Sequence, residues 1–298
     1  MRVFLTGGTG YVGSAVLESL ARGGHQVDAL VRNSEGAAKV QARGATPVLG
    51  DLLQPSSWRD AAAAADGSIH AAAHSGPKGR EADEIAVEVL TTLPPKEHRF
   101  LIYTSGIWVL GPSPVPADET APLNPMEIVS WRPAHEQRVL DTASAGVRAV
   151  VIRPGVVYGG SRGIVGDLLQ DAANSLVRIV GSGENHWPLI YDRDLGELYV
   201  RIVNTPTAAG VYHANDEGDE TVNDIVAALG EHAHTQPSIR HIPLPEARKK
   251  MGPYADALAL DQLVRSPRAR ALGWTPTLRS VAGNVARLFE EWKRGKAA

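Results

Sequence analysis

The sequence contains no cysteine among its 298 residues. That absence excludes disulfide bonds, thiol nucleophiles and thiolate metal sites together. Long apolar runs are missing too, since no segment approaches the ~18 to 20 apolar residues that a membrane span requires. An apolar strand pattern begins almost at Met1, which leaves no room for a signal peptide. We therefore expect a soluble, cytoplasmic protein.

A strong excess of charge of either sign is also lacking. Charged residues make up 21% of the chain and leave a formal net charge of −3. This balance argues against nucleic acid or an anionic membrane as a general partner. The partner that we expect is a small molecule.

What the chain does contain is an alternation of short apolar runs with helix-like segments. Strands that alternate with helices of about 10 to 15 residues predict an α/β fold with a doubly wound, parallel Rossmann sheet. The segments predicted as strands are residues 2–8, 25–32, 45–51, 68–73, 99–106, 147–155 and 210–216. The segments predicted as helices are residues 13–24, 56–67, 220–232 and a final helix that carries Leu278, Val281, Val285, Leu288 and Trp292.

A glycine-rich segment, TGGTGYVG, directly follows the first predicted strand and opens a helix. Glycines there allow a tight turn and a close backbone approach, and the helix N-terminus offers free N–H groups to a pyrophosphate. A purely structural turn is the alternative. The strand–turn–helix context favours a dinucleotide site, for which we predict the residues Gly7, Gly10, Tyr11, Val12 and Gly13.

The end of the second predicted strand carries Val31, Arg32 and Asn33, and no carboxylate. An acid about 20 residues after the glycine loop would hold the ribose 2′-hydroxyl of NAD. A guanidinium suits the 2′-phosphate of NADP instead, in a contact worth about 1.5 to 3 kcal/mol. A surface arginine without a role is the alternative. We predict NADP as the cofactor, with NAD less favoured.

The regular alternation loosens after Gly155. We predict a dinucleotide-binding Rossmann domain over residues 1–160, joined by a returning strand near 190–215, and a mainly substrate-binding, discontinuous portion over 161–298. Residues 110–125 hold five prolines in sixteen residues, so we predict a loop there that contributes to the site.

These residues, in this order, resemble the extended short-chain dehydrogenase/reductase family, in its NAD-dependent epimerase/dehydratase group. The resemblance covers nearly the whole chain. It rests on TGGTGYVG, on GD at 50–51, and on DGSIHAAA, YTSG, RPGVVYG, WPLIYDRDLG and ALGWTP further along. It implies that Asp51, with Leu52 beside it, lies near the adenine, that Ala71, Ala72 and Ala73 line the cofactor, and that Pro154 flanks the nicotinamide.

The proton relay that the resemblance implies is absent from this chain. In the family a tyrosine exchanges a proton, and a lysine four residues later lowers the pKa of that tyrosine and holds the nicotinamide ribose. Glu136 matches the glutamate that follows this lysine, which puts Arg132 at the lysine position and Ile128 at the tyrosine position. The serine position falls on Gly106. No lysine follows any of the seven tyrosines at that spacing.

Arg132 can still hydrogen-bond a ribose, but a guanidinium stays protonated at physiological pH and cannot act as a proton shuttle. Pro133 is tolerated only in a first helical turn, so this helix is expected to start late, with Ser130 as its cap. Ile128 and Arg132 would then not share a helical face.

Other side chains are candidates for the chemistry. Thr104 and Ser105 form a polar pair that could hold a substrate oxygen. Tyr158 and His74 are the nearest candidates for a proton donor, each weighed against a packing or surface role. His135 could face either the site or the solvent.

The remaining aromatic and histidine residues give weaker signals. Trp108 and Trp131 could form an apolar wall or belong to the core. His232 and His234 have too little around them for a metal site, so no metal is predicted.

Two classes of function stay open. One is an NADP-binding oxidoreductase or epimerase/dehydratase-like enzyme whose catalytic candidates are Ser105, Thr104, Tyr158 and Arg132. The other is a sensor or regulatory protein that binds NADP without turnover. The retained C-terminal portion and the 110–125 segment favour the enzyme. A homodimer is the assembly left open.

Overall fold

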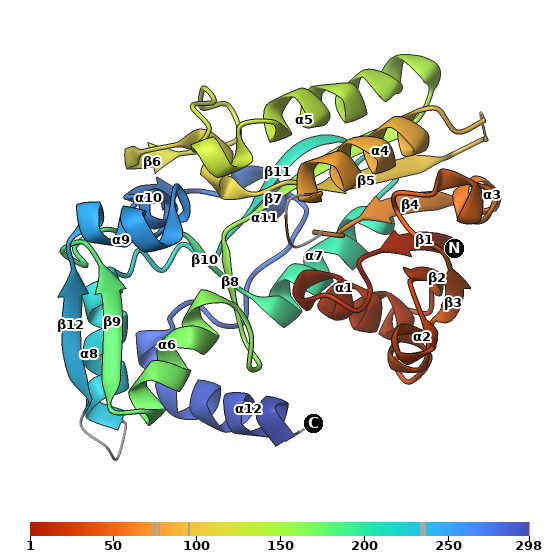
Figure 1. Cartoon of the computed structure of the whole chain (residues 1–298). Coiled ribbons are helices and arrows are strands. Elements are labelled where there is room, and N and C mark those ends of the chain that lie inside the picture. The colour runs from red at the N-terminus through yellow and green to blue at the C-terminus, as the bar shows by residue number, and fades with distance from the viewer. Residues whose placement is uncertain (74–75, 77, 95, 233–236, 298) are drawn as a thin grey trace.

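A computed structural model of the chain describes residues 1–73, 76, 78–94, 96–232 and 237–297. Its centre is a seven-stranded sheet in the order β11-β7-β5-β4-β1-β2-β3, with every neighbouring pair parallel (Figure 1). The strands are β1 (Arg2–Thr6), β2 (Gln26–Val31), β3 (Thr46–Leu49), β4 (Gly67–His70), β5 (Phe100–Thr104), β7 (Arg148–Pro154) and β11 (Gly210–Ala214). The predicted doubly wound α/β fold is confirmed.

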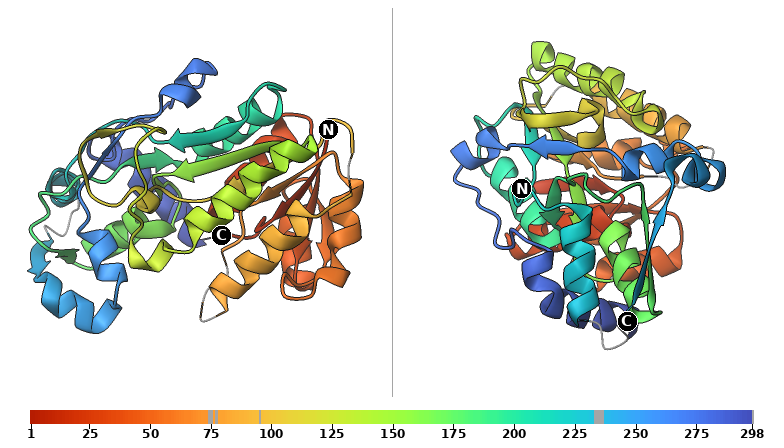
Figure 2. Two further views of the ribbon diagram at one scale, coloured as in Figure 1. Left: turned by 90° about the horizontal axis from the view of Figure 1, so that it is seen from above. Right: turned by 90° about the vertical axis from the view of Figure 1, so that its left-hand side faces the viewer.

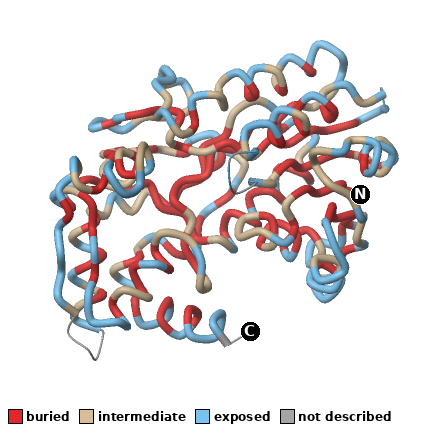
Figure 3. Tube along the Cα trace, viewed as in Figure 1, coloured by how far each residue is buried: buried red, intermediate tan, exposed pale blue. Residues whose placement is uncertain are grey.

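The sheet has two apolar faces because successive side chains of a strand point to opposite sides. Val3 and Leu5 belong to one buried cluster, whereas Phe4 between them belongs to the other. The first face is covered by α1 (Tyr11–Arg22) and α7 (Asp192–Val203), and the second by α3 (Arg59–Ala64), α4 (Gly79–Thr91) and α5 (Arg132–Asp141) (Figure 2). A shorter helix, α2 (Ser34–Gln41), lies near β3 at the edge. Figure 3 shows the middle of the central sheet as deeply buried, whereas β12 at the far side of the molecule is mostly exposed.

The helices α1 and α7 approach each other closely. A Cβ atom placed on Gly196 of α7 would lie 2.7 Å from the carbonyl oxygen of Ala15 in α1. Only glycine permits that approach, so an element from the second half of the chain packs directly on the helix that follows the glycine loop.

A second apolar core is built mostly from residues after Gly155 and lies beside the sheet (Figure 1). Its elements are β8 (Val156–Tyr158), α6 (Gly163–Ala173), β9 (Leu176–Val180), β10 (Leu189–Tyr191), α8 (Val222–His232) and α12 (Val285–Ala297). Around it lie β12 (Ser238–Ile242), α9 (Leu244–Met251), α10 (Tyr254–Leu258), β13 (Gln262–Val264) and α11 (Pro267–Ala271). Among the described helices, none is both long enough and apolar enough to cross a membrane.

The structure corrects two predicted elements. The proline-rich segment 110–125 is not all loop, because β6 (Ser113–Ala117) pairs in parallel with β13. Prolines are compatible with an edge strand in such a two-stranded pair. The final α-helix begins at Val285, later than predicted, because the carboxylate of Glu220 accepts hydrogen bonds from the backbone N–H groups of Val281 and Ala282 and holds the preceding turn.

Short 3₁₀ turns account for the other differences. The predicted helix 56–67 is divided into η1 (Pro55–Ser57) and α3. The turn η3 (Glu127–Val129) holds Ile128, and α5 begins only at Arg132, which confirms the late start and separates Ile128 from the helical face of Arg132. Ser130 is not the cap, because the residue before the helix is Trp131 and no side chain caps it. The remaining turns are η2 (Ile107–Leu110), η4 (Thr142–Ala145) and η5 (Ala282–Asn284).

Candidate dinucleotide and substrate site

The glycine loop between β1 and α1 is packed so tightly that side chains are excluded from it. Gly7 has a φ of +81°, and a Cβ atom on it would lie 2.6 Å from the carbonyl oxygen of Ala71. A Cβ atom on Gly13 would lie 2.0 Å from the carbonyl oxygen of Gly7. At Gly10, by contrast, a Cβ atom would meet only the Gly7 carbonyl oxygen, at 3.1 Å. Gly7 and Gly13 therefore shape the loop, whereas Gly10 keeps its outer side open.

Beside this loop lies a cavity of about 340 Å³, here called the glycine-loop cavity. It runs from the N-terminus of α1 past the ends of β2, β3 and β4. Of the predicted cofactor residues, those lining it are Gly7, Gly10, Tyr11, Val12, Arg32, Asp51, Leu52, Ala71, Ala72 and Ala73. Gly13 does not line it. The cavity lies at the N-terminus of α1, where free backbone N–H groups suit the pyrophosphate of a dinucleotide.

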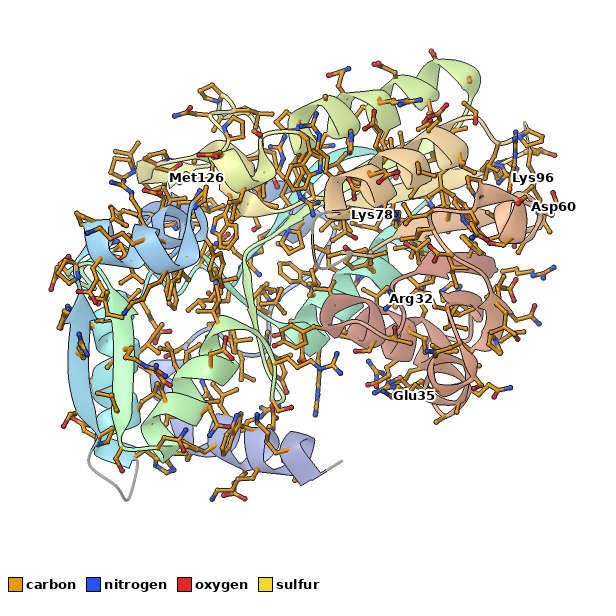
Figure 4. All side chains as sticks on the ribbon, in the orientation of Figure 1. Arg32, Glu35, Asp60, Lys78, Lys96 and Met126 are labelled. Atoms are coloured by element: carbon orange, nitrogen blue, oxygen red, sulfur yellow. The ribbon has the colours of Figure 1, made fainter. Side chains whose placement is uncertain are left out.

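Arg32 directly follows β2 and is one of the residues that line this cavity. Figure 4 labels its side chain. Its side chain is exposed. The carboxylate of Asp51 accepts a hydrogen bond from the backbone N–H of Leu53 at 2.9 Å, which orders the turn after β3. A guanidinium and an ordered turn thus lie at the end of the cavity that is farthest from β5 and β7.

A second cavity, of about 320 Å³, continues the first across the carboxyl ends of β5 and β7. The two cavities share Tyr11, Val12 and the alanines 71–73. We call the second one the apolar cavity, because its wall is built mainly from Ile107, Trp108, Val129, Val156, Val157 and Ile164. The predicted residues Thr104, Ser105, Arg132 and Pro154 also line it.

Arg132 is the one charged residue among those that line the apolar cavity. Its Nη1 donates to the backbone carbonyl of Thr104 at 2.8 Å and contacts the Tyr103 hydroxyl at 3.3 Å. The guanidinium also lies near the rings of Tyr103 and Trp131, at 5.9 and 5.7 Å from their centres. Arg132 is therefore held by one nitrogen, which leaves its other N–H groups as donors toward the cavity.

Behind Arg132, the Tyr103 hydroxyl that it contacts belongs to a buried network of polar groups. The carboxylate of Asp83 in α4 accepts hydrogen bonds from the Tyr103 hydroxyl at 2.7 Å and pairs with His135 at 2.6 Å and His70 at 3.1 Å. Burial opposes ionisation of Asp83, but the hydrogen bonds from His135 and His70 keep its pKa far below its usual value. His135 thus faces neither the cavity nor the solvent, which corrects both predicted orientations.

The two hydroxyls at the end of β5 differ in what they can still donate. The Ser105 hydroxyl donates to the carboxylate of Glu136, which is itself paired with Arg153 at 2.5 Å. Its proton is therefore engaged inside the protein. Thr104 Oγ1 lies 2.7 Å from the hydroxyl of Tyr199, and either group can be the donor. If Tyr199 donates, the Thr104 proton is free to point into the cavity.

The structure places Tyr158 away from the apolar cavity. Its ring is fully buried, its hydroxyl donates to the carboxylate of Asp216 at 3.1 Å, and its ring lies 5.7 Å from that of Tyr191. Burial raises the pKa of the Tyr158 phenol far above its ordinary value, and burial also raises the pKa of Asp216 to about 7. These features argue against the predicted role of Tyr158 as a proton donor.

The variant Tyr158→Phe is accordingly expected to keep its turnover within about twofold and to lose stability. Asp216 would lose a buried donor, at a cost of roughly 1 to 3 kcal/mol. Urea unfolding and steady-state kinetics on the same preparation measure the two effects. A collapse of kcat at unchanged stability would contradict this placement.

The other side chains predicted for the site have different positions in the structure. Trp108 lines the apolar cavity and packs edge-on against Tyr254, whereas Trp131 lies under Arg132 and does not line it. His74 and His234 lie outside the described residues. Sequence reasoning missed Val129, which lines the cavity one position after Ile128. It also missed Tyr199, whose partner lies 95 residues away.

Known proteins resemble the chain over this whole site. The model of the NAD dependent epimerase/dehydratase family matches residues 3–215. The chain belongs to this family. An uncharacterized protein of Schizosaccharomyces pombe is 31% identical over 294 residues, which cover 96% of this chain and 98% of that protein. A ketoreductase of Stigmatella aurantiaca, named for 4-hydroxy-2-methyl-3-oxo-4-farnesyl-3,4-dihydroquinoline-1-oxide, is 28% identical over 83% of this chain and 78% of its own.

A solved structure confirms the fold. The human epimerase family protein SDR39U1, crystallised with NADPH, superimposes with a TM-score of 0.75 at 21% identity over 97% of this chain and 99% of that chain. Because the family model matches residues 3–215, the predicted family, that of the extended short-chain dehydrogenase/reductase type, is confirmed. As a member of the epimerase/dehydratase family, this chain departs from the expected relay at Ile128, Arg132 and Gly106.

Proposed function

We propose that the protein binds NADP and reduces a carbonyl group on a small, largely apolar molecule. The observation that carries this proposal is the continuity of the two cavities. A dinucleotide held at the glycine loop would extend past Tyr11 and Val12 into the apolar cavity, where Arg132 and Thr104 offer hydrogen-bond donors. Pro154 would flank the nicotinamide.

The nicotinamide, when bound, supplies a hydride. The chain's own part is to orient the substrate and to stabilise negative charge on its oxygen. The free N–H groups of Arg132 and the hydroxyl of Thr104 would donate hydrogen bonds to that oxygen, in an apolar surrounding where such bonds are strengthened. Because Arg132 cannot release a proton, the proton that completes the alcohol would come from water.

Support for a carbonyl substrate comes from the wall of the cavity and from one relative. A nearly uncharged cavity favours an apolar molecule. The Stigmatella aurantiaca relative is named as a ketoreductase. The non-catalytic alternative is less favoured, because the chain has a second cavity with polar donors beyond the glycine loop.

The structure gives less support to a nucleotide sugar, whose diphosphate needs free cations. A neighbouring cavity between α6, β9, β12 and α9 does contain Arg178, Arg240 and Lys250. Each of them faces a carboxylate, however: Arg178 pairs with Asp171 at 2.6 Å, while Arg240 and Lys250 lie 3.8 and 3.3 Å from Glu246. We therefore place carbonyl reduction ahead of epimerisation.

The test is NADPH oxidation, followed at its absorbance maximum, against a panel of aryl and alkyl ketones, β-keto acids, aldehydes and nucleotide sugars. The proposal expects turnover with apolar carbonyl compounds. Binding of NADPH without turnover of any member would support the non-catalytic alternative, and turnover confined to nucleotide sugars would support an epimerase or dehydratase.

The choice of NADP rests on Arg32, since the family's own description names NAD. The variant Arg32→Asp is expected to bind NADP at least about tenfold more weakly, because it loses a charge-assisted contact and gains a repulsive carboxylate. Its affinity for NAD should change little or rise. Calorimetric titration with both dinucleotides measures this, and equal affinities of the unaltered protein for NAD and NADP would refute the assignment.

Three further expectations belong to this proposal. We propose that the division near residue 160 separates a cofactor-binding part from a mainly substrate-binding part, that the protein works in the cytoplasm, and that it forms a homodimer. Light scattering on the purified protein tests the last of these.

A further inference from the structure

The turn between β8 and α6 lies against the glycine loop, although about 150 residues of chain separate them. The hydroxyl of Tyr11 donates to the carbonyl oxygen of Gly159 at 2.7 Å. A Cβ atom on Gly163 would lie 2.8 Å from the Tyr11 ring, so Gly163 permits this contact. The turn is thus fixed beside the cofactor cavity by Tyr11.

Arg162 lies at the end of this turn. Its Nη1 reaches to 3.4 Å from the carbonyl oxygen of Thr9, and Thr9 lines the glycine-loop cavity. The side chain is exposed, and its guanidinium forms no ion pair with a carboxylate of the described part of the chain. The first turn of α1 also carries no acidic residue. A free cation therefore lies next to the loop whose N–H groups face the cavity.

We infer that Arg162 is a further cofactor-binding residue, whose guanidinium binds the diphosphate of the dinucleotide across from the glycine loop. This inference rests on the proposed function. A guanidinium is always charged, and its planar donors match two phosphate oxygens at once. The weak contact to Thr9 would be exchanged for a stronger one to phosphate, and this exchange needs only a rotation of the side chain, since Tyr11 already holds the turn.

The position of Arg162 gives it a task different from that of Arg32. Arg32 follows β2 at the far end of the cavity, where a 2′-phosphate would lie. Arg162 lies at the glycine loop, where it contacts the carbonyl oxygen of Thr9 from the glycine-loop cavity and directly precedes Gly163 from the wall of the apolar cavity. The two arginines would therefore recognise different phosphates of one molecule.

Calorimetric titration with three probes separates the two tasks. NADPH contains both the diphosphate and the 2′-phosphate, ADP-ribose contains only the diphosphate, and adenosine 2′-monophosphate contains only the 2′-phosphate. The variant Arg162→Ala is expected to bind NADPH and ADP-ribose about tenfold more weakly and adenosine 2′-monophosphate unchanged. The variant Arg32→Ala is expected to lose affinity for NADPH and adenosine 2′-monophosphate and to keep it for ADP-ribose.

The matched control is a variant that removes a different arginine close to α1. Arg294 lines, with Gly160, a separate polar cavity beside α1, so Arg294→Ala tests whether a general loss of positive charge suffices. Its affinities should equal those of the unaltered protein. An unchanged affinity of Arg162→Ala for ADP-ribose overturns this inference alone, as does an equal loss for all three probes. Failure of the unaltered protein to bind any of them overturns the proposed function as well.

Discussion

Replacing Gly10 by Val is expected to abolish NADP binding and to leave the fold intact. A Cβ atom on Gly10 meets only one protein atom, the Gly7 carbonyl oxygen at 3.1 Å, so the branched side chain can be accommodated by moving outward. That direction is the glycine-loop cavity, where the pyrophosphate would approach the backbone. We expect the dissociation constant to rise at least about 100-fold, since both the close approach and the N–H contacts would be lost.

Calorimetry measures the affinity, and thermal unfolding measures the fold. Gly230→Val is the matched control, because a Cβ atom on Gly230 in α8 meets nothing within 4 Å. It should bind NADP as the unaltered protein does. Undiminished NADP affinity in Gly10→Val would refute the dinucleotide site.

Replacing Arg132 by Ala is expected to lower kcat/KM by about 10² to 10³, the usual effect of deleting one donor to a developing oxyanion. Arg132 is the one charged residue among those that line the apolar cavity, and under the proposed function its remaining N–H groups would donate to the substrate oxygen. The affinity for NADPH should fall less, because Arg132 lines only the apolar cavity and lies away from the glycine-loop cavity, where the adenosine and diphosphate parts of the dinucleotide would bind.

The variant Arg132→Lys serves as the comparison. A lysine keeps the charge but cannot both bond the Thr104 carbonyl and present further donors in the fixed plane of a guanidinium. The kcat/KM of Arg132→Lys should lie between that of the unaltered protein and that of Arg132→Ala. A loss of kcat/KM in Arg132→Ala that is matched by the loss of NADPH affinity would instead assign Arg132 to the nicotinamide ribose.

The cofactor side of the site could be predicted from the sequence because it depends on local spacing. The glycine loop, Arg32 and the alanines 71–73 each lie at the end of a strand, and parallel strands bring such ends to one edge. The position of Arg132 followed from its distance to Glu136 along a single helix.

The catalytic side could not be predicted in the same way because it depends on distant partners. The hydroxyl of Ser105 is engaged by Glu136, 31 residues away, and that of Tyr158 by Asp216, 58 residues away. No spacing in the sequence reports which of two hydroxyls keeps a free proton. The strand within 110–125 was hidden for a similar reason, since its partner β13 begins only at Gln262.

The edge strand β11 has a consequence for how this protein is made. β11 pairs with β7, although β8, α6, β9, β10 and α7 lie between them in the sequence. The seven-stranded sheet therefore cannot be completed until the ribosome has passed residue 214. Until then one edge of β7 is unpaired. The cover that α7 provides to α1 through Gly196 forms only after Val203 has been made. Leu195, Leu198 and Tyr199 of α7 pack on apolar side chains of the sheet. In a nascent chain that ends before α7, those side chains of the sheet would be exposed to solvent or to chaperones. Completion of the central sheet and of its α1 face therefore depends on segments that follow β8, α6 and β9, which build much of the second apolar core.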